Sequence, residues 1–329
     1  IMNPPLLSIR DLAVEFDTRE GPVRAVDGVS IDVCEGETLG IVGESGSGKT
    51  VTFLATMGLL PTSGRVVAGQ ARLDGHDLLA ASEGQLRRIR GRRVGMVFQD
   101  PMTSLHPMLR VGPQIAEALQ VHDRSMSRAV ARSRVVELLA SVGVPDPAAR
   151  YAGYPHQWSG GMRQRAMIAM AVANAPALLI ADEPTTALDV TIQAQVLEVL
   201  KAACAQARSA AVLITHDLGV IAEVADRVAV MYAGRIVETA PVEELFEHPR
   251  HPYTVGLLAG RPRLDGDLLP LVGIPGRPPD PANRPTGCAF HPRCSLRDGR
   301  QRCVGEDPPL EMVAERHRSA CHFSSELER

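Results

Sequence analysis

The segment that most constrains this chain is a glycine-rich loop, Gly43-Glu44-Ser45-Gly46-Ser47-Gly48-Lys49-Thr50. It matches the G-x-x-x-x-G-K-[ST] phosphate-loop pattern and directly follows the apolar run Leu39–Val42. The glycines let backbone N–H groups turn toward phosphates, Lys49 can reach the β- and γ-phosphates, and the Thr50 hydroxyl can bind Mg²⁺. Val51–Leu60 then reads as a helix that begins at the phosphate site. The pattern predicts that the chain binds a nucleoside triphosphate.

Short apolar, β-branched runs alternate with helical patterns from Leu6 to about Val242, which is typical of an α/β domain with a largely parallel sheet. The predicted strands are Leu7–Phe16, Ser30–Val33, Leu39–Val42, Val94–Phe98, Leu178–Ala181, Ala211–Thr215 and Val228–Tyr232. Amphipathic patterns at Gln114–Gln120 and Arg128–Val142, with no strand between them, predict a helical subdomain inserted at about residues 99–165.

The composition changes after residue 240. Thirteen of the 25 prolines and four of the six cysteines fall in the last 89 residues. A segment this rich in proline is predicted to be loop-rich and to need a covalent or metal staple. The sequence therefore predicts a domain at residues 1–240 and a C-terminal extension at residues 241–329.

Two acidic residues, Asp182 and Glu183, end the apolar run Ala177–Ala181. A strand that ends in two acids can project its carboxylates toward a nucleotide. Asp182 is predicted to hold Mg²⁺, directly or through water, and Glu183 to polarise the attacking water.

A third pattern opens the helical stretch Met162–Ala173 and reads Trp158-Ser159-Gly160-Gly161-Met162-Arg163-Gln164-Arg165. Ser159 is placed to cap the helix, and the two glycines leave bare backbone where a phosphate can approach. The segment predicts an anion-binding helix N-terminus.

Together these patterns resemble the ATP-binding-cassette (ABC) ATPases, whose signature reads L-S-G-G-Q or, in some importers, L-S-G-G-M-R-Q-R. Trp158 replaces the leading leucine, a change expected to affect packing more than the phosphate-facing groups. The resemblance covers about 240 residues and implies an antiparallel β subdomain beside the sheet and the helical insertion. It also implies roles for Phe16 at adenine, Gln99 at Mg²⁺, Gln164 in the signature, Asp189 in the D-loop Thr186-Ala187-Leu188-Asp189, and His216 as the switch histidine.

In this family two cassettes pair head to tail, so that ATP on the Gly43–Thr50 loop of one subunit is covered by Ser159–Gly161 of its partner. The resemblance implies catalysis by positioning and charge stabilisation. Its expected catalytic residues are Lys49, Glu183 and His216, and its expected Mg²⁺ residues are Thr50, Gln99 and Asp182.

Further segments resemble the oligopeptide/dipeptide importer branch: Gln99–Pro107, Ile180–Val190, His251-Pro252-Tyr253-Thr254 and Ile274-Pro275-Gly276. This resemblance implies an ATPase subunit that powers import of short peptides. Its implied partners are two membrane-spanning permease subunits, a solute-binding protein that delivers cargo, and a second ATPase subunit, either a paralogue or a second copy. One alternative is the same role with another cargo, such as nickel, glutathione or another small solute. A second alternative is a soluble ABC ATPase that is not coupled to transport.

Four cysteines of the extension, Cys288, Cys294, Cys303 and Cys321, form a candidate metal site. Because no secretion signal is seen, thiols or metal ligands are expected rather than disulfides. Spacing alone admits Zn²⁺ or a [4Fe–4S] cluster, and the resemblance to the peptide-importer branch implies the cluster. We expect it to be structural, with a redox or iron sensor that throttles transport as the alternative. Cys34 and Cys204 lie outside the set and are predicted to pack as small hydrophobic residues.

Charge and hydropathy limit the remaining classes. The net charge of −3 argues against nucleic-acid binding, which a basic excess would favour. The longest nearly apolar stretch, Ala166–Ala181, is too short to cross a bilayer. These features predict a soluble, cytoplasmic protein, and the resemblance to the importers implies a peripheral position at the cytoplasmic face of the cell membrane.

Overall fold

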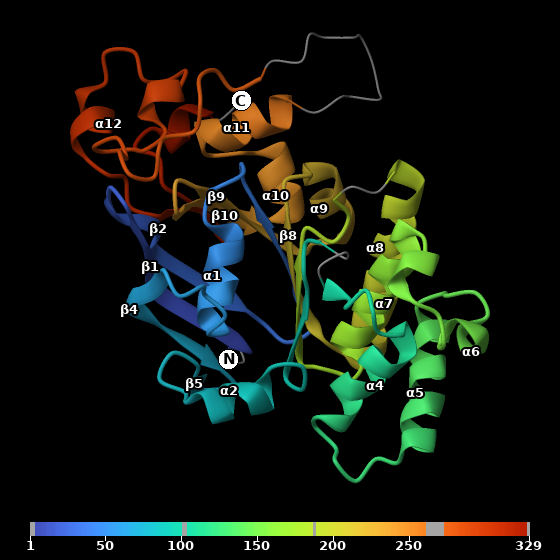
Figure 1. Cartoon of the computed structure of the whole chain (residues 1–329). Helices are drawn as coiled ribbons and strands as arrows, with labels where there is room; N and C mark the ends of the chain where they lie inside the picture. The colour runs from blue at the N-terminus through green and yellow to red at the C-terminus, as the bar shows by residue number, and fades with distance from the viewer. Residues whose placement is uncertain (1–3, 101–103, 187–188, 261–272, 328–329) are drawn as a thin grey trace. The chain divides into compact units, whose positions relative to one another are not determined.

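The structure, a computed structural model, describes residues 4–100, 104–186, 189–260 and 273–327 (Figure 1). Its internal contacts divide the chain into two compact units. The helical unit contains residues 1–6, 33–38 and 80–214, and the phosphate-loop unit contains residues 7–32, 39–79 and 215–329.

One sheet of the phosphate-loop unit has four strands in the order β2-β1-β4-β5. These strands are Gly21–Val33, Leu7–Thr18, Gly64–Leu73 and His76–Asp77, respectively. The β1–β4 and β4–β5 pairs are antiparallel, with Leu7 opposite Leu73 and Phe16 opposite Gly64. This is the antiparallel β subdomain that the resemblance implied.

A second set of strands in this unit carries the glycine-rich loop, in the order β11-β12-β10-β9-β3. They span Glu311–Ala314, His317–Ser319, Arg235–Pro241, Arg227–Tyr232 and Thr38–Val42. Strand β3 is parallel to β9, whereas β10, β12 and β11 follow in antiparallel pairs. The C-terminal extension therefore adds two strands to the sheet that bears the loop.

Short helices complete the phosphate-loop unit. They are α1 (Lys49–Thr56), α9 (Leu218–Val224), α10 (Val242–Glu247), α11 (Pro252–Ala259) and α12 (Gln301–Gly305), with 3₁₀ turns η2 (His291–Arg293) and η3 (Ser324–Leu327). Helix α1 is shorter than predicted, because Gly58 takes a φ of +61° and the N–H groups of Gly58 and Leu59 donate back to Ala55 and Leu54. A glycine in the left-handed region is a common helix stop.

The helical unit is built on three parallel strands in the order β8-β7-β6: Ala210–Thr215, Leu178–Asp182 and Val94–Val97. Every residue of β7 is buried, as expected for a strand covered on both faces. Its helices are α2 (Glu83–Ile89), α4 (Val111–Gln120), α5 (Arg128–Ser141), α6 (Pro147–Arg150), α7 (Gly160–Val172) and α8 (Val190–Ala207), with a 3₁₀ turn η1 at Pro155–Gln157. Helices α4, α5 and α7 pack on one another (Figure 1).

The seven predicted strands are confirmed, although Ser30–Val33 is only the last part of β2. Strands β4, β5, β10, β11 and β12 were not predicted. Strand β4 shows why such strands escape prediction. Its only buried residues are Ala71 and Leu73, and its sequence therefore lacks a strong alternation of apolar and polar residues. It forms because its backbone pairs with β1, an interaction that periodicity does not report.

The extension is joined to β2 by an ionic cluster around Asp27. The Asp27 carboxylate accepts from Arg235 at 2.8 Å and from Arg284 at 2.7 Å, and both arginines also pair with Asp307. Burial alone would raise the pKa of Asp27, but the hydrogen bonds and charges of its arginine partners, Arg235 foremost, outweigh that effect and hold this pKa below its ordinary value.

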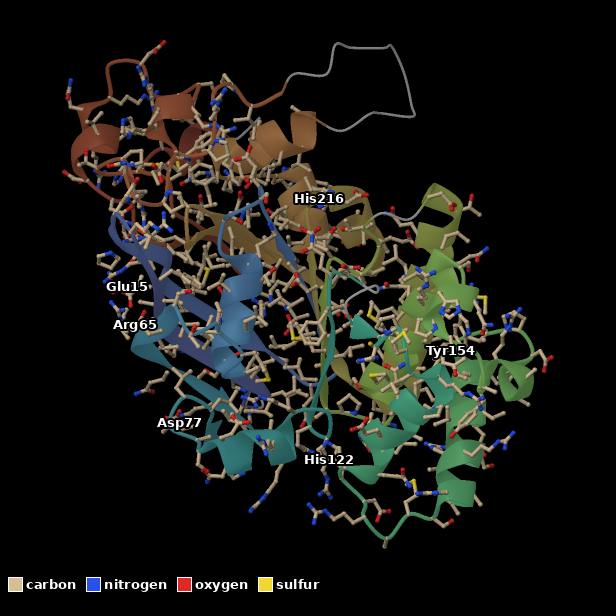
Figure 2. The ribbon with its side chains drawn as sticks, viewed as in Figure 1. Glu15, Arg65, Asp77, His122, Tyr154 and His216 are labelled. Carbon is tan, nitrogen blue, oxygen red and sulfur yellow. The ribbon has the colours of Figure 1, made fainter. Side chains whose placement is uncertain are left out.

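We expect Asp27→Asn to lower the free energy of unfolding by about 2 kcal/mol at pH 7, because charge-assisted hydrogen bonds are lost. A carboxyl whose pKa is depressed by folding stabilises the protein above its unfolded-state pKa, near 4, and loses that contribution as the pH falls through the folded-state value. Urea unfolding at pH 7 and pH 3 should therefore show a gap between the two proteins that closes in acid. Asp17→Asn is the control, because Asp17 pairs with Arg65, which is labelled in Figure 2, and both side chains are exposed. A gap that is equal at both pH values would contradict the assignment.

Candidate nucleotide site

The glycine-rich loop joins the end of β3 to the start of α1, as predicted, and two of its glycines have no room for a side chain. A Cβ on Gly43 would lie 2.2 Å from the Met231 carbonyl oxygen, and one on Gly48 would lie 2.6 Å from the Ala25 carbonyl oxygen. Gly48, with a φ of +97°, is also the N-cap of α1. The loop can approach the backbone of β9 and β2 only because these positions are glycine.

The Lys49 side chain folds back onto the glycine-rich loop and binds two of its carbonyl oxygens. This side chain is buried, and its Nζ donates to the carbonyl oxygens of Gly43 at 2.7 Å and Glu44 at 2.9 Å. Within the described part of the chain, the buried Ser47 hydroxyl has no hydrogen-bond partner. The loop thus presents a held ammonium and an unsatisfied hydroxyl, both suited to an oxyanion ligand.

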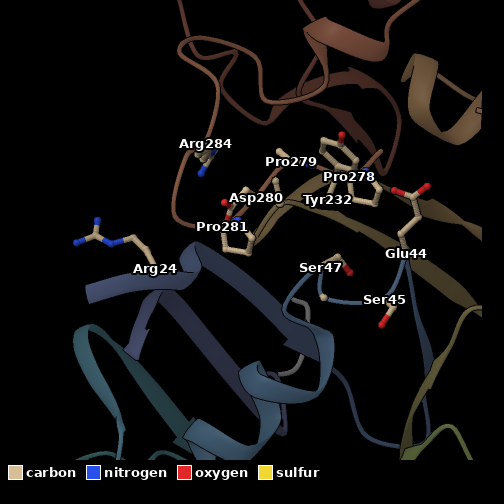
Figure 3. A pocket seen from close by; sticks show the side chains of 12 residues that line it. Arg24, Glu44, Ser45, Ser47, Tyr232, Pro278, Pro279, Asp280, Pro281 and Arg284 are labelled. Carbon is tan, nitrogen blue, oxygen red and sulfur yellow. The ribbon is translucent and has the colours of Figure 1, made fainter. Parts of the chain in front are cut away.

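A pocket opens beside the first half of the loop (Figure 3). One wall is the loop segment Glu44–Ser47, and another is formed by Tyr232, the last residue of β9, and Ala233. Arg24 of β2, the segment Pro278–Pro281 and Arg284 also line it. The extension therefore forms part of a pocket at the glycine-rich loop.

Phe16 lies near the end of β1 and is half-buried. Its ring occupies the space over Gly64, its partner on β4, where a Cβ would approach the ring to 2.7 Å. The glycine opposite Phe16 thus leaves room for this ring on the sheet.

The acidic pair lies at the end of β7 in the helical unit. Asp182 is buried, and Glu183 takes a left-handed φ of +45° while its N–H donates to the Ile214 carbonyl at 2.8 Å. The Glu183 carboxylate accepts from Gln99 Nε2 and Thr186 Oγ1, each at 2.9 Å. The structure thus brings Gln99 and Glu183 together, and holds the acid in a backbone conformation that is costly for a side chain.

The signature segment begins α7. Ser159 is the N-cap, and its hydroxyl accepts from the Met162 N–H at 3.3 Å. A Cβ on Gly161 would lie 2.7 Å from the Ile192 side chain of α8. Asp189 caps α8 by accepting from the Ile192 N–H at 3.0 Å. Ser159 and Asp189 therefore cap two helices, α7 and α8, that contact each other at Gly161.

The neighbours of Ser159 in the sequence are tightly packed. Gln164 is buried, and Trp158 is only 2% exposed. The prediction that Trp158 affects packing is consistent with this burial. His216, just after β8, is exposed (Figure 2). Ala187 and Leu188 of the D-loop motif, and Pro101, Met102 and Thr103 after Gln99, lie outside the described residues.

The four cysteines of the extension line one cavity, together with His251, His291 and Phe290. Burial raises the pKa of Cys288 to about 11 and that of Cys321 to about 12, and it also raises the pKa values of Cys294 and Cys303. Among the described residues, no three or more His, Cys, Asp or Glu side chains are arranged to hold a metal ion between them.

The two remaining cysteines differ. Cys204 is mostly buried, and burial raises its pKa to about 11, as a packed thiol should show. The packing predicted for Cys34 is wrong, because Cys34 lies exposed in the turn between β2 and β3.

Sequence reasoning missed the partners of Glu44. Tyr253 accepts a hydrogen bond from the Glu44 N–H at 2.8 Å, and Arg293 donates to the Glu44 carboxylate at 2.6 and 2.9 Å. Tyr253 belongs to the segment His251–Thr254 that resembles the importers. However, no local pattern indicates its contact with Glu44 across 209 residues of chain, or that of Arg293 across 249 residues.

No helix in the described parts of the chain is long and apolar enough to cross a membrane.

A phosphate loop between a parallel strand and a helix, with a strand ending in Asp-Glu and a capped Ser-Gly-Gly helix, defines an ATP-binding cassette. Residues 26–186 match the family described as "ABC transporter", and residues 237–303 match "Oligopeptide/dipeptide transporter, C-terminal region". The chain is 50% identical to the dipeptide transport ATP-binding protein DppD of Escherichia coli (strain K12) over 318 residues, covering 97% of this chain and 96% of that protein.

It is 52% identical to the oligopeptide transport ATP-binding protein OppD of Bacillus subtilis (strain 168), covering 95% of this chain and 87% of that protein. A solved structure described as "Dimeric structure of a post-hydrolysis state of the ATP-binding cassette MJ0796 bound to ADP and Pi" aligns with a TM-score of 0.65 and 26% identity, over 72% of this chain and 98% of the solved one. The chain belongs to the family of oligopeptide/dipeptide ABC transporter ATP-binding proteins.

Proposed function

We propose that this chain is the ATP-hydrolysing subunit that energises import of oligopeptides or dipeptides through a membrane ABC transporter. One observation carries the proposal: about 50% identity to peptide-transport ATP-binding proteins continues from the cassette through the C-terminal extension. Nickel, glutathione or another small solute remains the alternative cargo, because the sites described above bind nucleotide and not cargo.

The phosphate site is assigned to Gly43–Thr50, with Lys49 as the cation that meets the β- and γ-phosphates. Its held position between two loop carbonyls supports this role, because a phosphate oxygen can take the place of a carbonyl. Phe16 is assigned to adenine. Mg²⁺, when bound with ATP, neutralises phosphate charge, and Thr50, Gln99 and Asp182 are the residues that would hold it.

Glu183 is assigned to orient the attacking water, because its carboxylate follows the end of β7 and is held in place by hydrogen bonds from Gln99 and Thr186. His216 is assigned to the γ-phosphate. Across a subunit pair, the N-terminus of α7 at Ser159, Gly160 and Gly161 would face the partner's ATP. Asp189, the N-cap of α8, would lie near it, and Gln164 would support it from its buried position in α7. A helix N-terminus capped by Ser159 supports this assignment.

We propose a nucleotide-binding domain at residues 1–240, with a helical subdomain at about 99–165, and an extension at 241–329. The family matches at residues 26–186 and 237–303 support a division into two parts. The helical subdomain would dock on two permease subunits at the cytoplasmic face of the membrane. The second ATPase subunit is a paralogue or another copy, cargo comes from a solute-binding protein, and no nucleic acid takes part.

The four-cysteine cavity is proposed to hold a [4Fe–4S] cluster, with Zn²⁺ as the alternative. Its support is that the four thiols, which lie between residues 288 and 321, line one cavity. Within the described residues the thiols are not already arranged around one metal position, so binding of the group would have to draw them together. The cluster, when bound, would cross-link a segment that has few regular elements of its own.

Glu183→Gln should leave ATP affinity within about twofold while lowering turnover by 10²-fold or more, roughly the contribution of a positioned base. The measurements are equilibrium nucleotide binding and steady-state phosphate release. Glu198→Gln on α8 is the matched control, since Glu198 is exposed and forms a surface pair with Lys201 at 3.8 Å. Normal turnover in Glu183→Gln would remove Glu183 from this role.

Protein purified without oxygen should contain about four iron and four sulfide per chain if the cluster is present. Cys303→Ser should lose the iron and expose the extension to protease, whereas Cys34→Ser, at an exposed thiol, should change neither. Stoichiometric zinc without iron would favour the alternative. A protease-resistant extension with no metal of either kind would refute a metal site.

A further inference from the structure

Two segments of the C-terminal extension contact Glu44, the second residue of the phosphate loop, and a third supports one of them. Arg293 in η2 donates from both terminal nitrogens to the Glu44 carboxylate, at 2.6 and 2.9 Å. Tyr253 on α11 accepts from the Glu44 N–H at 2.8 Å. The Pro275 carbonyl accepts from Arg293 Nε at 2.8 Å and so holds the guanidinium from behind. The recognised motifs of the extension thus converge on one loop residue.

The contact from Tyr253 acts on the peptide unit that joins Gly43 to Glu44. The N–H of this unit donates to the Tyr253 hydroxyl, and its carbonyl accepts from Lys49 Nζ at 2.7 Å. Because a peptide unit is planar, the two bonds fix one plane from opposite sides. The carbonyl that holds Lys49 is therefore oriented in part by a hydroxyl of the extension.

The contact from Arg293 is buried and two-pronged. The Arg293 side chain is 5% exposed and that of Glu44 is 25% exposed. Two parallel bonds between a guanidinium and a carboxylate fix direction as well as distance, and separating such a pair would leave a buried charge unpaired. The Glu44 side chain therefore has one strongly preferred position, which the extension sets.

Arg293 and Tyr253 are themselves held by an aromatic cluster. The rings of Tyr232, Tyr253 and Phe290 lie with centroids 4.6 to 5.4 Å apart, and all three residues are buried. The Arg293 guanidinium lies 5.9 Å from the Tyr232 ring centroid and 6.0 Å from that of Phe290. His251 caps α11 by accepting from the Tyr253 N–H at 3.1 Å, and burial keeps this histidine neutral by lowering its pKa to about 3. The donors and acceptors that face Glu44 are thus preorganised.

We propose that Arg293 and Tyr253 are positioning residues for the phosphate loop, through which the C-terminal extension sets the affinity of this subunit for ATP. The proposal rests on the proposed function above and extends the phosphate site beyond the cassette. The pocket in Figure 3 agrees with it, because Pro278–Pro281 of the extension and Glu44–Ser47 of the loop line the same space. Neither Arg293 nor Tyr253 is assigned to touch the reacting atoms.

The test is equilibrium titration of the full-length chain with Mg²⁺ and the non-hydrolysable ATP analogue AMP-PNP. Arg293→Gln should weaken binding on the order of tenfold or more, because the loop is no longer held in its binding geometry. Arg293→Lys should be intermediate, since one ammonium cannot make the two-pronged contact. Tyr253→Phe should also weaken binding, although it removes only one oxygen.

A double-mutant comparison of Arg293 and Glu44 separates a positioning role from a general loss of stability. If Arg293 acts through Glu44, then Glu44→Gln should weaken binding like Arg293→Gln, and the double variant should bind no more weakly than the worse single one. In the assembled transporter these changes should raise KM for ATP and leave kcat at saturating ATP within about twofold. Arg300→Gln is the matched control, because Arg300 makes a two-pronged pair with Glu326 in the same extension, at 2.9 and 2.6 Å, away from the loop. Its affinity should stay that of the wild type.

Affinities within twofold of the wild type in Arg293→Gln, Glu44→Gln and Tyr253→Phe would overturn the proposal. If Arg293→Gln fails to fold, as judged by circular dichroism, the other two variants decide. Wild-type protein that binds no AMP-PNP would contradict the proposed function instead, so the two failures are distinct.

Discussion

The phosphate loop depends on a lysine ammonium held by the carbonyl groups of its own loop. Lys49 can take this position only if the loop curls, and the loop can curl only if Gly43 lies against the Met231 carbonyl with no side chain between them. The parallel pairing of β3 with β9 brings Met231 to that point. The register of β3 and β9, the glycine at position 43 and the burial of Lys49 therefore depend on one another.

The helical unit meets a different constraint. Its water-orienting candidate, Glu183, follows a fully buried strand and adopts a left-handed backbone that a side chain ordinarily avoids. Hydrogen bonds from Gln99 and Thr186 to the carboxylate, and from its N–H to Ile214, hold it there. The local backbone strain at Glu183 is consistent with a position selected for chemistry more than for stability. At the helix caps, the short polar side chains of Ser159 and Asp189 likewise fix the backbone through hydrogen bonds.

Much of this could be predicted from the sequence because the relevant signals are local. The phosphate loop, the acids at the end of β7 and the serine cap of α7 each lie within a few residues of the pattern that predicts them. Buried strands such as β7 begin with a continuous apolar run, here Leu178–Ala181. Strand β4 was missed because backbone pairing and not burial defines it. The contacts of Glu44 were missed because they depend on how the extension folds back on β9 and β10, which no local pattern encodes. Cys34 was misjudged because a small thiol in a turn carries no sign of its exposure.

The loop closed around Lys49 is proposed to be the nucleotide site of this protein, and calorimetric titration of the purified full-length chain and of Lys49→Ala with Mg²⁺ and ATP would decide whether it is. We expect saturable binding of one ATP per chain in the wild type, and binding weakened at least about a hundredfold in the variant, because a charge-assisted contact to the triphosphate is lost. Equal affinities in the two proteins would exclude Lys49 from the site.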